Sequence, residues 1–252
     1  MARLFDDASS EYLMITAAPV TAVPLTLACW FKVDAIVGSA CPICIMDADS
    51  TTEGFVLHLV DDAGDLEVWG RTASLNTWNE AKATASFSLN TWHHAAFVTS
   101  AVDSRAAYLD GGNKGTEATA RMPTGIDTMT IGRLTRAVAA SYVSGSVAET
   151  AIWNVALTDA EVAELAAGLC PLFVRPGALV AYYPLGGIYD ANDGDHDIVG
   201  GYNMTAYNTP STAGHPPKMK YPASPMVIVA SAAVAGIIPQ IMHHRKQQRR
   251  RR

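Results

Sequence analysis

The stretch TWHHAAFVTSAVDSRAAYLDGG, residues 91–112, predicts two antiparallel strands joined by a tight turn. The residues before and after VDSR form the two strands, VDSR forms the turn, and LDGG ends the second strand. His93 and His94 are neighbours on the first arm, so they point to opposite faces, and we expect one to be buried and hydrogen-bonded. Adjacent strand positions cannot readily share a metal ion. The expected core or rim aromatics of this hairpin are Trp92, Phe97 and Tyr108.

The same pattern extends on both sides of this hairpin. Residues 25–35, LTLACWFKVDA, alternate, with the odd-numbered positions from Leu25 to Phe31 on one face. Residues 54–70 hold a second hairpin around DDAGD. Further strands are expected at 129–134, 144–153 and 178–185. Many short strands separated by Gly, Asn, Asp and Ser indicate an all-β antiparallel sandwich or barrel and not a βαβ fold.

A short helix is predicted near residues 158–167. Thr158 and Glu161 have the spacing of a capping box, in which each side chain binds the backbone N–H of the other. Apolar residues follow at helical spacing, and Gly168 is the expected residue just past the C-terminal end. The Pro-rich residues 208–225 read as a linker or a surface strap.

Charge divides the chain into two unequal parts. Six of the 18 Lys and Arg residues lie in 245–252, so residues 1–244 carry 12 of them against 24 Asp and Glu, a net charge of -12. An acidic body repels nucleic acid, which leaves the tail as the part that could attract phosphate. The start of the chain, MARLFDDASSEYL, lacks the apolar region of a signal peptide, so we expect synthesis in a cytoplasm without secretion.

The four cysteines do not form a zinc-binding pattern. Cys41 and Cys44 make a CPIC motif, but no second CxxC or HxxxH accompanies it. A thioredoxin-like role would need a βαβ context. Reduced cysteines in or near the core are the favoured interpretation, and a disulfide is the alternative.

These signatures together resemble a known family. In order, they are FDDASSEYL, LTLACWFKVDA, NTWHHAAFVTS with RAAYLDGG, MTIGRL, and SGSVAETAIWNVALTDAEVAELAAG. Over residues 3–168 they resemble the laminin-G-like jelly roll of the concanavalin A-like lectin/glucanase superfamily, of the stand-alone type seen in bacteriophage proteins. The later segment 179–208, with the D-x-x-G turn that begins at Asp197, resembles another part of that family. The resemblance implies a two-sheet antiparallel jelly-roll sandwich with one short helix and a C-terminal extension.

The resemblance also implies what sites to look for. Related glucanases carry carboxylates as E-x-D-x-x-E on a strand, and no strand here has that run, so we expect no enzyme. Related domains often hold Ca²⁺ at a rim of the sandwich. The candidate ligands here are Asp47, Asp49, Asp195 and Asp197. Asx turns are the alternative for these residues, and Asp197 is expected to hold its own D-x-x-G turn. The candidate glycan-stacking aromatics are Trp69, Trp78, Tyr142 and Tyr189, with burial in the core as the alternative.

The end of the chain is expected to attach the protein to something else. Residues 226–242 are apolar but short for a membrane helix, and a basic cluster follows: Arg245, Lys246, Arg249, Arg250, Arg251 and Arg252. We therefore divide the chain into a sandwich at 1–207, a linker or strap at 208–225 and a docking or anchoring tail at 226–252. The leading hypothesis is a non-enzymatic structural or decoration protein of a phage particle, located in the virion, with a glycan-binding sandwich. Its partners would be other virion subunits or copies of itself, and phosphate, nucleic acid or an acidic protein at the tail. A membrane-anchored carbohydrate-binding module is the alternative, and a glycan-active enzyme ranks third.

Overall fold

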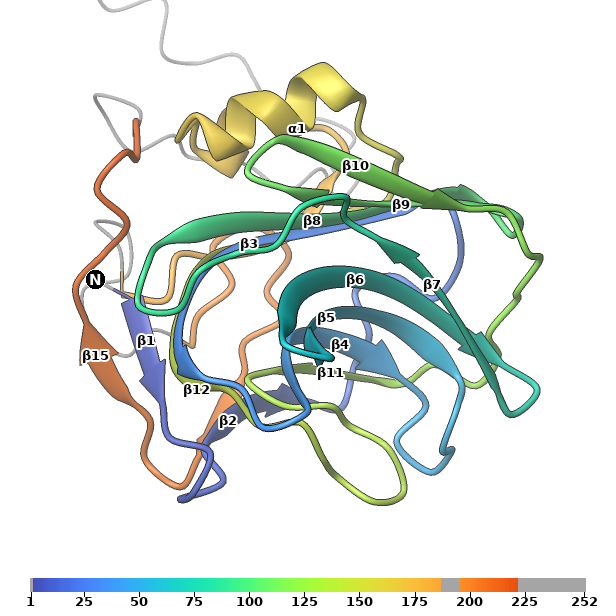
Figure 1. Cartoon of the computed structure of the whole chain (residues 1–252), viewed down its shortest axis with the longest axis horizontal. Coiled ribbons are helices and arrows are strands. Elements are labelled where there is room, and N and C mark those ends of the chain that lie inside the picture. The colour runs from blue at the N-terminus through green and yellow to red at the C-terminus, as the bar shows by residue number, and fades with distance from the viewer. Residues whose placement is uncertain (1, 187–194, 222–252) are drawn as a thin grey trace, which may run out of the picture.

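The computed structural model describes residues 2–186 and 195–221, which fold into two stacked antiparallel sheets and a short helix (Figure 1). In this part of the chain, sheet A has eight strands in the order β10-β9-β8-β3-β12-β1-β15, with β13 also paired to β12. Its strands are β1 (Ala2–Phe5), β3 (Leu25–Ala35), β8 (His93–Ala101), β9 (Ser104–Leu109), β10 (Gly112–Glu117), β12 (Ser144–Trp153), β13 (Leu179–Tyr183) and β15 (Ser211–Ala213).

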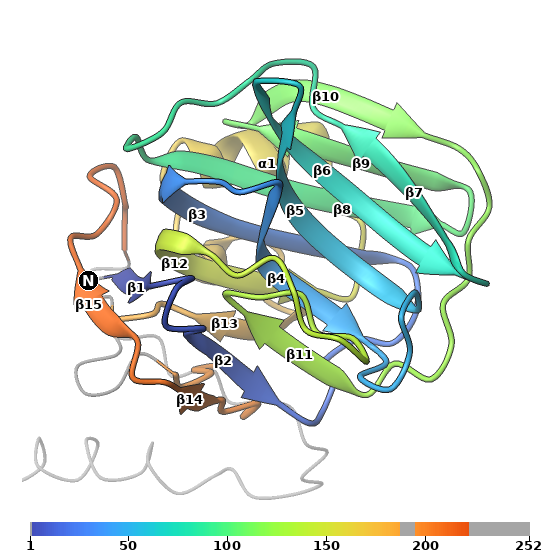
Figure 2. The same ribbon diagram turned by 60° about the horizontal axis from the view of Figure 1, so that its bottom comes forward.

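Sheet B covers one face of sheet A, and Figure 2 shows it from outside. Within the described residues it has seven strands in the order β14-β2-β11-β4-β5-β6-β7. They are β2 (Tyr12–Ile15), β4 (Ser39–Met46), β5 (Gly54–Asp62), β6 (Asp65–Ser74), β7 (Thr77–Lys82), β11 (Thr128–Ile131) and β14 (Thr205–Tyr207). The predicted jelly-roll sandwich is therefore confirmed, including both hairpins and the strands at 25–35 and 144–153.

The main core lies between the sheets, and the alternation of β3 shows why. Leu25, Leu27 and Phe31 are fully buried in the cluster shared with sheet B. The opposite face of β3 is buried as well, because Ala28 and Trp30 pack beneath the helix and the C-terminal segment. Sheet A is thus covered on both faces, which explains why outward positions such as Ala28 and Trp30 are apolar.

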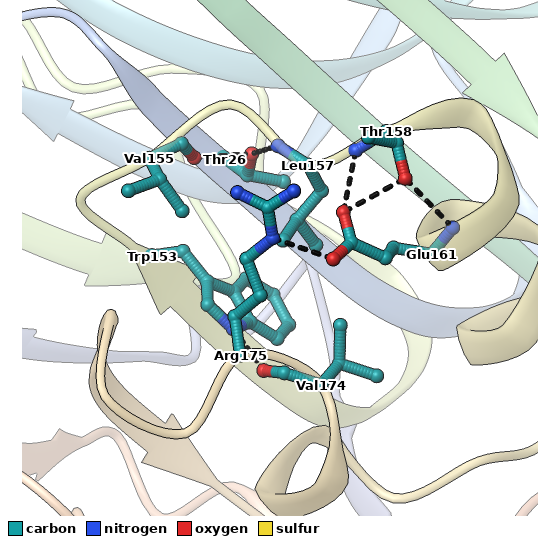
Figure 3. Close-up of polar contacts among 8 residues, drawn as sticks. All are labelled: Thr26, Trp153, Val155, Leu157, Thr158, Glu161, Val174 and Arg175. Carbon is teal, nitrogen blue, oxygen red and sulfur yellow. Dashed lines mark hydrogen bonds and ion pairs between the residues drawn. The ribbon is translucent and has the colours of Figure 1, made fainter.

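Helix α1 (Asp159–Ala166) lies on the face of sheet A opposite sheet B (Figure 1). The predicted capping box is present: Thr158 Oγ1 accepts from the Glu161 N–H, and Glu161 Oε2 accepts from the Thr158 N–H at 2.7 Å. Arg175 Nε also donates to Glu161, as Figure 3 shows. Gly168, which follows the C-cap Ala167, has a φ of 91°. The N–H groups of Gly168 and Leu169 donate to carbonyls of the last turn, as in a Schellman motif.

The Trp153 end of β12 connects this helix to the sheet. Trp153 is fully buried, and its indole N–H donates to the Val174 carbonyl at 2.8 Å (Figure 3). Thr26 of β3 accepts the Leu157 N–H at 3.0 Å and donates to the Val155 carbonyl at 2.8 Å. These bonds satisfy the polar groups of the turn between β12 and α1, so the helix is fixed against sheet A.

Within the described residues, the segment after β14 packs on the sandwich. β15 pairs with β1 at the edge of sheet A, and residues 214–221, which we call the strap, run from there toward the C-terminal end of α1 (Figure 1). The Lys220 N–H donates to the Gly168 carbonyl at 2.7 Å, and the Lys220 carbonyl accepts from the Cys170 N–H at 3.2 Å. A Cβ at position 168 would lie 2.0 Å from the Lys218 carbonyl, so only glycine lets the strap approach this closely.

Candidate functional site

Two of the predicted glycan-stacking residues, Trp69 and Trp78, lie close together on the outer face of sheet B. Arg71 lies between them, with its guanidinium carbon 5.3 Å from the Trp69 ring centre and 4.7 Å from that of Trp78. The Lys82 ammonium is 4.0 Å from the Trp69 ring centre, and the Trp69 N–H donates to Glu67 at 2.6 Å. Cation–π contacts therefore already use these indole rings, which leaves less of their surface for stacking on a sugar.

The third predicted aromatic, Tyr142, lies toward the other end of the same sheet. It meets Tyr12 edge to face at 6.3 Å, and Tyr12 stacks on Tyr207 at 4.6 Å. The Arg133 guanidinium carbon lies 3.6 Å from the Tyr12 ring centre. Tyr142 thus belongs to an aromatic–cation cluster separate from the tryptophans. The fourth, Tyr189, lies outside the described residues.

The predicted calcium ligands Asp47 and Asp49 lie in the loop between β4 and β5. Asp47 Oδ1 accepts from the Asp49 N–H at 2.9 Å, which is an Asx turn. Asp127 Oδ1 accepts from the Ala48 N–H at 3.1 Å, which brings a third carboxylate to this loop. In the part of the chain that the structure describes, no three His, Cys, Asp or Glu side chains are grouped to hold a metal ion. Calcium at this rim stays a prediction.

Asp197 is a buried turn residue, as expected from its D-x-x-G sequence. Its carboxylate accepts four backbone N–H groups at 2.8–3.0 Å: those of Tyr182, Val199, Gly200 and Tyr202. A carboxylate has about four lone-pair sites, so calcium could bind here only in exchange for one of these bonds. Its neighbour Asp195 faces His196, with Oδ1 3.3 Å from Nδ1.

The cysteines and the tail complete the sequence predictions. All four cysteines lie in described regions, where they are buried and unpaired, and burial raises the pKa of Cys170 to about 11. CPIC lies within strand β4, with its two thiols in a small apolar cluster on sheet B. The predicted docking tail, with Arg245, Lys246 and Arg249 to Arg252, lies outside the described residues. None of the described helices has the length and apolar character needed to cross a bilayer.

The structure brings together a site that the sequence did not single out. A depression of about 310 Å³ lies where the start of β8, the turn after β9, the end of α1 and the strap meet. Its lining residues are Trp30, Thr91, Trp92, His93, Asp110, Ala166, Pro217 and Lys218. Trp92 is half-buried, while Thr91, Pro217 and Lys218 are exposed. The depression therefore combines an aromatic ring with a hydroxyl, a carboxylate and an ammonium group.

Asp110 joins the two strands of the 91–112 hairpin at this depression. Its Oδ2 lies 2.7 Å from His93 Nδ1, and its Oδ1 accepts from the His94 N–H at 2.8 Å. Burial opposes ionisation of Asp110, but these hydrogen bonds outweigh it and hold the pKa of the carboxyl below its usual range. The Asp110 side chain remains 44% exposed, so the anion can still accept hydrogen bonds from a ligand.

The two histidines point to opposite faces, as predicted. His94 is buried beside Trp30, with ring centres 5.6 Å apart, and burial lowers its pKa to about 4. The expected side-chain hydrogen bonds belong instead to its half-buried neighbour: His93 contacts Asp110 and, through Nε2, Ser88 at 3.2 Å. Within the described residues His94 Nδ1 has no partner. The prediction was therefore right about burial and wrong about which ring carries the hydrogen bonds.

A larger, open trough of about 670 Å³ lies on the outer face of β8, β9 and β10 beside the start of α1. Asp159 lies at its edge and accepts from Tyr108 Oη at 2.7 Å and from Lys114 Nζ at 2.8 Å. The hydrogen bonds from Lys114 and Tyr108 lower the pKa of Asp159, and those from Thr119 lower the pKa of Glu117. The trough presents mainly hydroxyl and charged groups, and its aromatic residue, Tyr108, is buried.

Sequence reasoning missed the depression because its parts come from four separate segments. Trp92 carried a signal, since it is part of the W-H motif and directly precedes β8, but the sequence could not show whether its ring was exposed. Pro217 and Lys218 carried none, because their place depends on how the strap folds back over sheet A.

Comparison with known proteins identifies the class to which this sandwich belongs. A family model described as the concanavalin A-like lectin/glucanases superfamily matches residues 7–163, and the chain belongs to that superfamily. The fold is similar to that of a Bacteroides ovatus protein described as a candidate carbohydrate-binding protein, with 18% identity and a TM-score of 0.56. That match covers 83% of this chain and 58% of the Bacteroides protein.

A second similar structure is the CBM40 of a Ruminococcus gnavus IT-sialidase, solved with α2,3-sialyllactose. It is 12% identical, with a TM-score of 0.50, and the match covers 58% of this chain and 84% of the module. No curated protein matches the chain. At these identities the two structures establish a shared fold.

Proposed function

We propose that this chain is a non-catalytic carbohydrate-binding protein that holds a glycan in the depression beside Trp92. The observation that carries the proposal is the half-buried indole surrounded by Thr91, Asp110 and Lys218. Sugars stack their apolar faces on aromatic rings and hydrogen-bond through hydroxyls to carboxylate, ammonium and hydroxyl groups. Membership of a lectin-like superfamily supports this assignment.

The charge states of the carboxylates support binding without catalysis. Glycoside hydrolases need a carboxylic acid whose pKa is raised, so that it stays protonated and can donate to the leaving oxygen. The pKa of Asp110 in the depression is lowered instead, as are those of Asp159 and Glu117 in the open trough. These carboxylates are therefore anions at neutral pH, suited to accepting hydrogen bonds from sugar hydroxyls.

The test is a glycan-array screen followed by calorimetry with the best ligand. Trp92→Ala should weaken binding at least tenfold, whereas Trp92→Phe should retain much of it because a ring remains. Trp78→Ala is the matched control, and its affinity should equal that of the wild type because its ring packs with Arg71. Wild-type affinity in Trp92→Ala would contradict the site, and release of shortened sugar from the ligand would contradict the non-catalytic role.

We also propose that the protein is a decoration protein of a phage particle. The sandwich would be displayed outward, and the tail at 226–252 would attach it to the particle. The resemblance to stand-alone phage jelly rolls and the contrast between acidic body and basic tail support this role. Liposome flotation of residues 1–252 and 1–225 distinguishes it from a membrane anchor. If residues 1–252 float with liposomes at high salt and residues 1–225 do not, the tail is a membrane anchor. If residues 1–252 do not float, or float only at low salt, the tail belongs in a protein interface.

A further inference from the structure

Glu149 occupies an unusual place for a charged residue. It lies near the middle of strand β12, is 2% exposed, and has a φ of 54°. The pairing of β12 with β3 shifts register between Ala148 and Ala151, so Glu149 belongs to a bulge. A buried carboxylate and a left-handed backbone at a non-glycine residue both cost free energy, and they persist where the surroundings compensate.

The compensation comes from three side chains that gather at this carboxylate. Tyr182 of β13 donates its hydroxyl to Oε2. Tyr221 Oη donates to Oε1 at 2.6 Å, and His215 Nε2 lies 2.7 Å from the same oxygen. Burial and the charge of Glu149 raise the pKa of Tyr182 well above its usual value, so Tyr182 remains a protonated donor. We call these four residues the Glu149 clasp.

The clasp holds the strap at two points. His215 and Tyr221 lie near the two ends of the strap, and their side chains converge on one carboxylate, with Tyr221 Oη 2.8 Å from His215 Nε2. Pro217 and Lys218 lie between these two points and line the depression that contains Trp92. Met219 packs with Trp92 against Trp30. The strap is therefore a wall of the depression, and Glu149 fixes the positions from which that wall projects.

We propose that Glu149 is a positioning residue for glycan binding, which acts through His215 and Tyr221 to hold Pro217 and Lys218 against the Trp92 site. This proposal rests on the proposed function. The carboxylate is enclosed beneath the strap, so it acts on the ligand through the strap and not by direct contact. When the clasp is formed, a glycan stacked beside Trp92 would meet Lys218 projecting from a fixed segment of backbone.

The experiment compares Glu149→Gln and the strap-side double variant His215→Ala/Tyr221→Phe with the wild type, in the full chain. Glu164→Gln, an exposed residue of α1, is the matched control. Amide hydrogen exchange over residues 214–221 reports the strap without any ligand, and calorimetry with the best glycan of the array reports the site. The double variant leaves the buried carboxylate in place, so it tests the clasp even where Glu149→Gln fails to fold.

We expect both clasp variants to exchange strap amides about tenfold faster and to bind the glycan about tenfold more weakly, a loss of about 1.4 kcal/mol. The control should match the wild type in both measurements.

Unchanged exchange rates of the strap amides would overturn the clasp. Faster exchange with unchanged or tighter binding would overturn the positioning role, and tighter binding would mean that the strap covers the site. Equal glycan affinity of the wild type and Trp92→Ala would contradict the proposed function and, with it, the positioning role. The exchange rates of the strap amides would still show whether the clasp holds the strap.

Discussion

Replacing Asp197 with asparagine should destabilise the sandwich by about 3 kcal/mol. The carboxylate accepts two backbone N–H groups on each oxygen, those of Tyr182 and Val199 on Oδ1 and those of Gly200 and Tyr202 on Oδ2. Asparagine has the same shape but offers one carbonyl oxygen, so its amide group must face two donors that it cannot satisfy. A hydrogen bond to a charged group contributes about 1.5–3 kcal/mol net, and the lower figure for each of the two bonds that are lost gives about 3 kcal/mol.

The measurement is thermal unfolding followed by circular dichroism at neutral pH, with EDTA and again with Ca²⁺. For a chain of this length each kcal/mol lowers Tm by about 2–4 °C, so Asp197→Asn should melt roughly 6–12 °C below the wild type. Asp47→Asn is the control, because Asp47 accepts the N–H of Asp49 in an exposed local turn, and we expect its Tm within about 2 °C of the wild type.

Two outcomes would refute this reasoning. A Tm for Asp197→Asn within about 2 °C of the wild type would mean that the four hydrogen bonds contribute little to the fold. A Tm that rises with Ca²⁺ in the wild type but not in Asp197→Asn would mean that the carboxylate binds the ion, contrary to its saturation by backbone donors.

Three further predictions concern stability. Trp153→Phe should lower the free energy of unfolding by about 2–3 kcal/mol in urea titrations, because it leaves the Val174 carbonyl without its donor and opens a cavity. Thr158→Ala should lower it by about 1 kcal/mol through loss of the N-cap, whereas a change below about 0.3 would mean that Glu161 alone caps the helix. The buried His94, with a pKa of about 4, should make stability fall as pH drops from about 6.5 toward 4, because the unfolded chain takes up the proton first. Urea titrations across this range should show a contribution from His94 of up to roughly 3 kcal/mol, which His94→Gln should remove. The buried His58, whose pKa burial lowers to about 3, should keep its own contribution in that variant.

Local patterns were enough to predict the sandwich. The alternation at 25–35 and the turn residues of the two hairpins are encoded over a few neighbouring residues, and the observed strands match them. The capping box at Thr158 is equally local. These features follow from backbone geometry and side-chain period, so a single sequence contains them.

The sites depended on register and on distant contacts. Trp69 and Trp78 are near loops in sequence, but the pairing of β6 with β7 places Lys82 opposite Trp69, and Arg71 lies between the rings. Glu149 is a single carboxylate within a predicted strand and matches none of the sequence motifs. Its partners His215 and Tyr221 lie 66 and 72 residues further along the chain, so no local pattern could indicate the clasp.

The strap both covers part of sheet A and lines the depression in which we propose that a glycan binds. Because α1 and the strap cover the outward face of its central strands, rings beneath them such as Trp30 and Trp153 are buried. Trp92 lies at the margin of this cover, where the end of the helix, the hairpin turn and the strap meet. The same covering that makes the central residues of sheet A apolar therefore creates the depression, and a change that loosens the strap should alter both the packing of Trp30 and the shape of the site. Stability and glycan affinity should consequently decline together in clasp variants, whereas substitutions at Trp69 or Trp78 on sheet B should leave affinity unchanged.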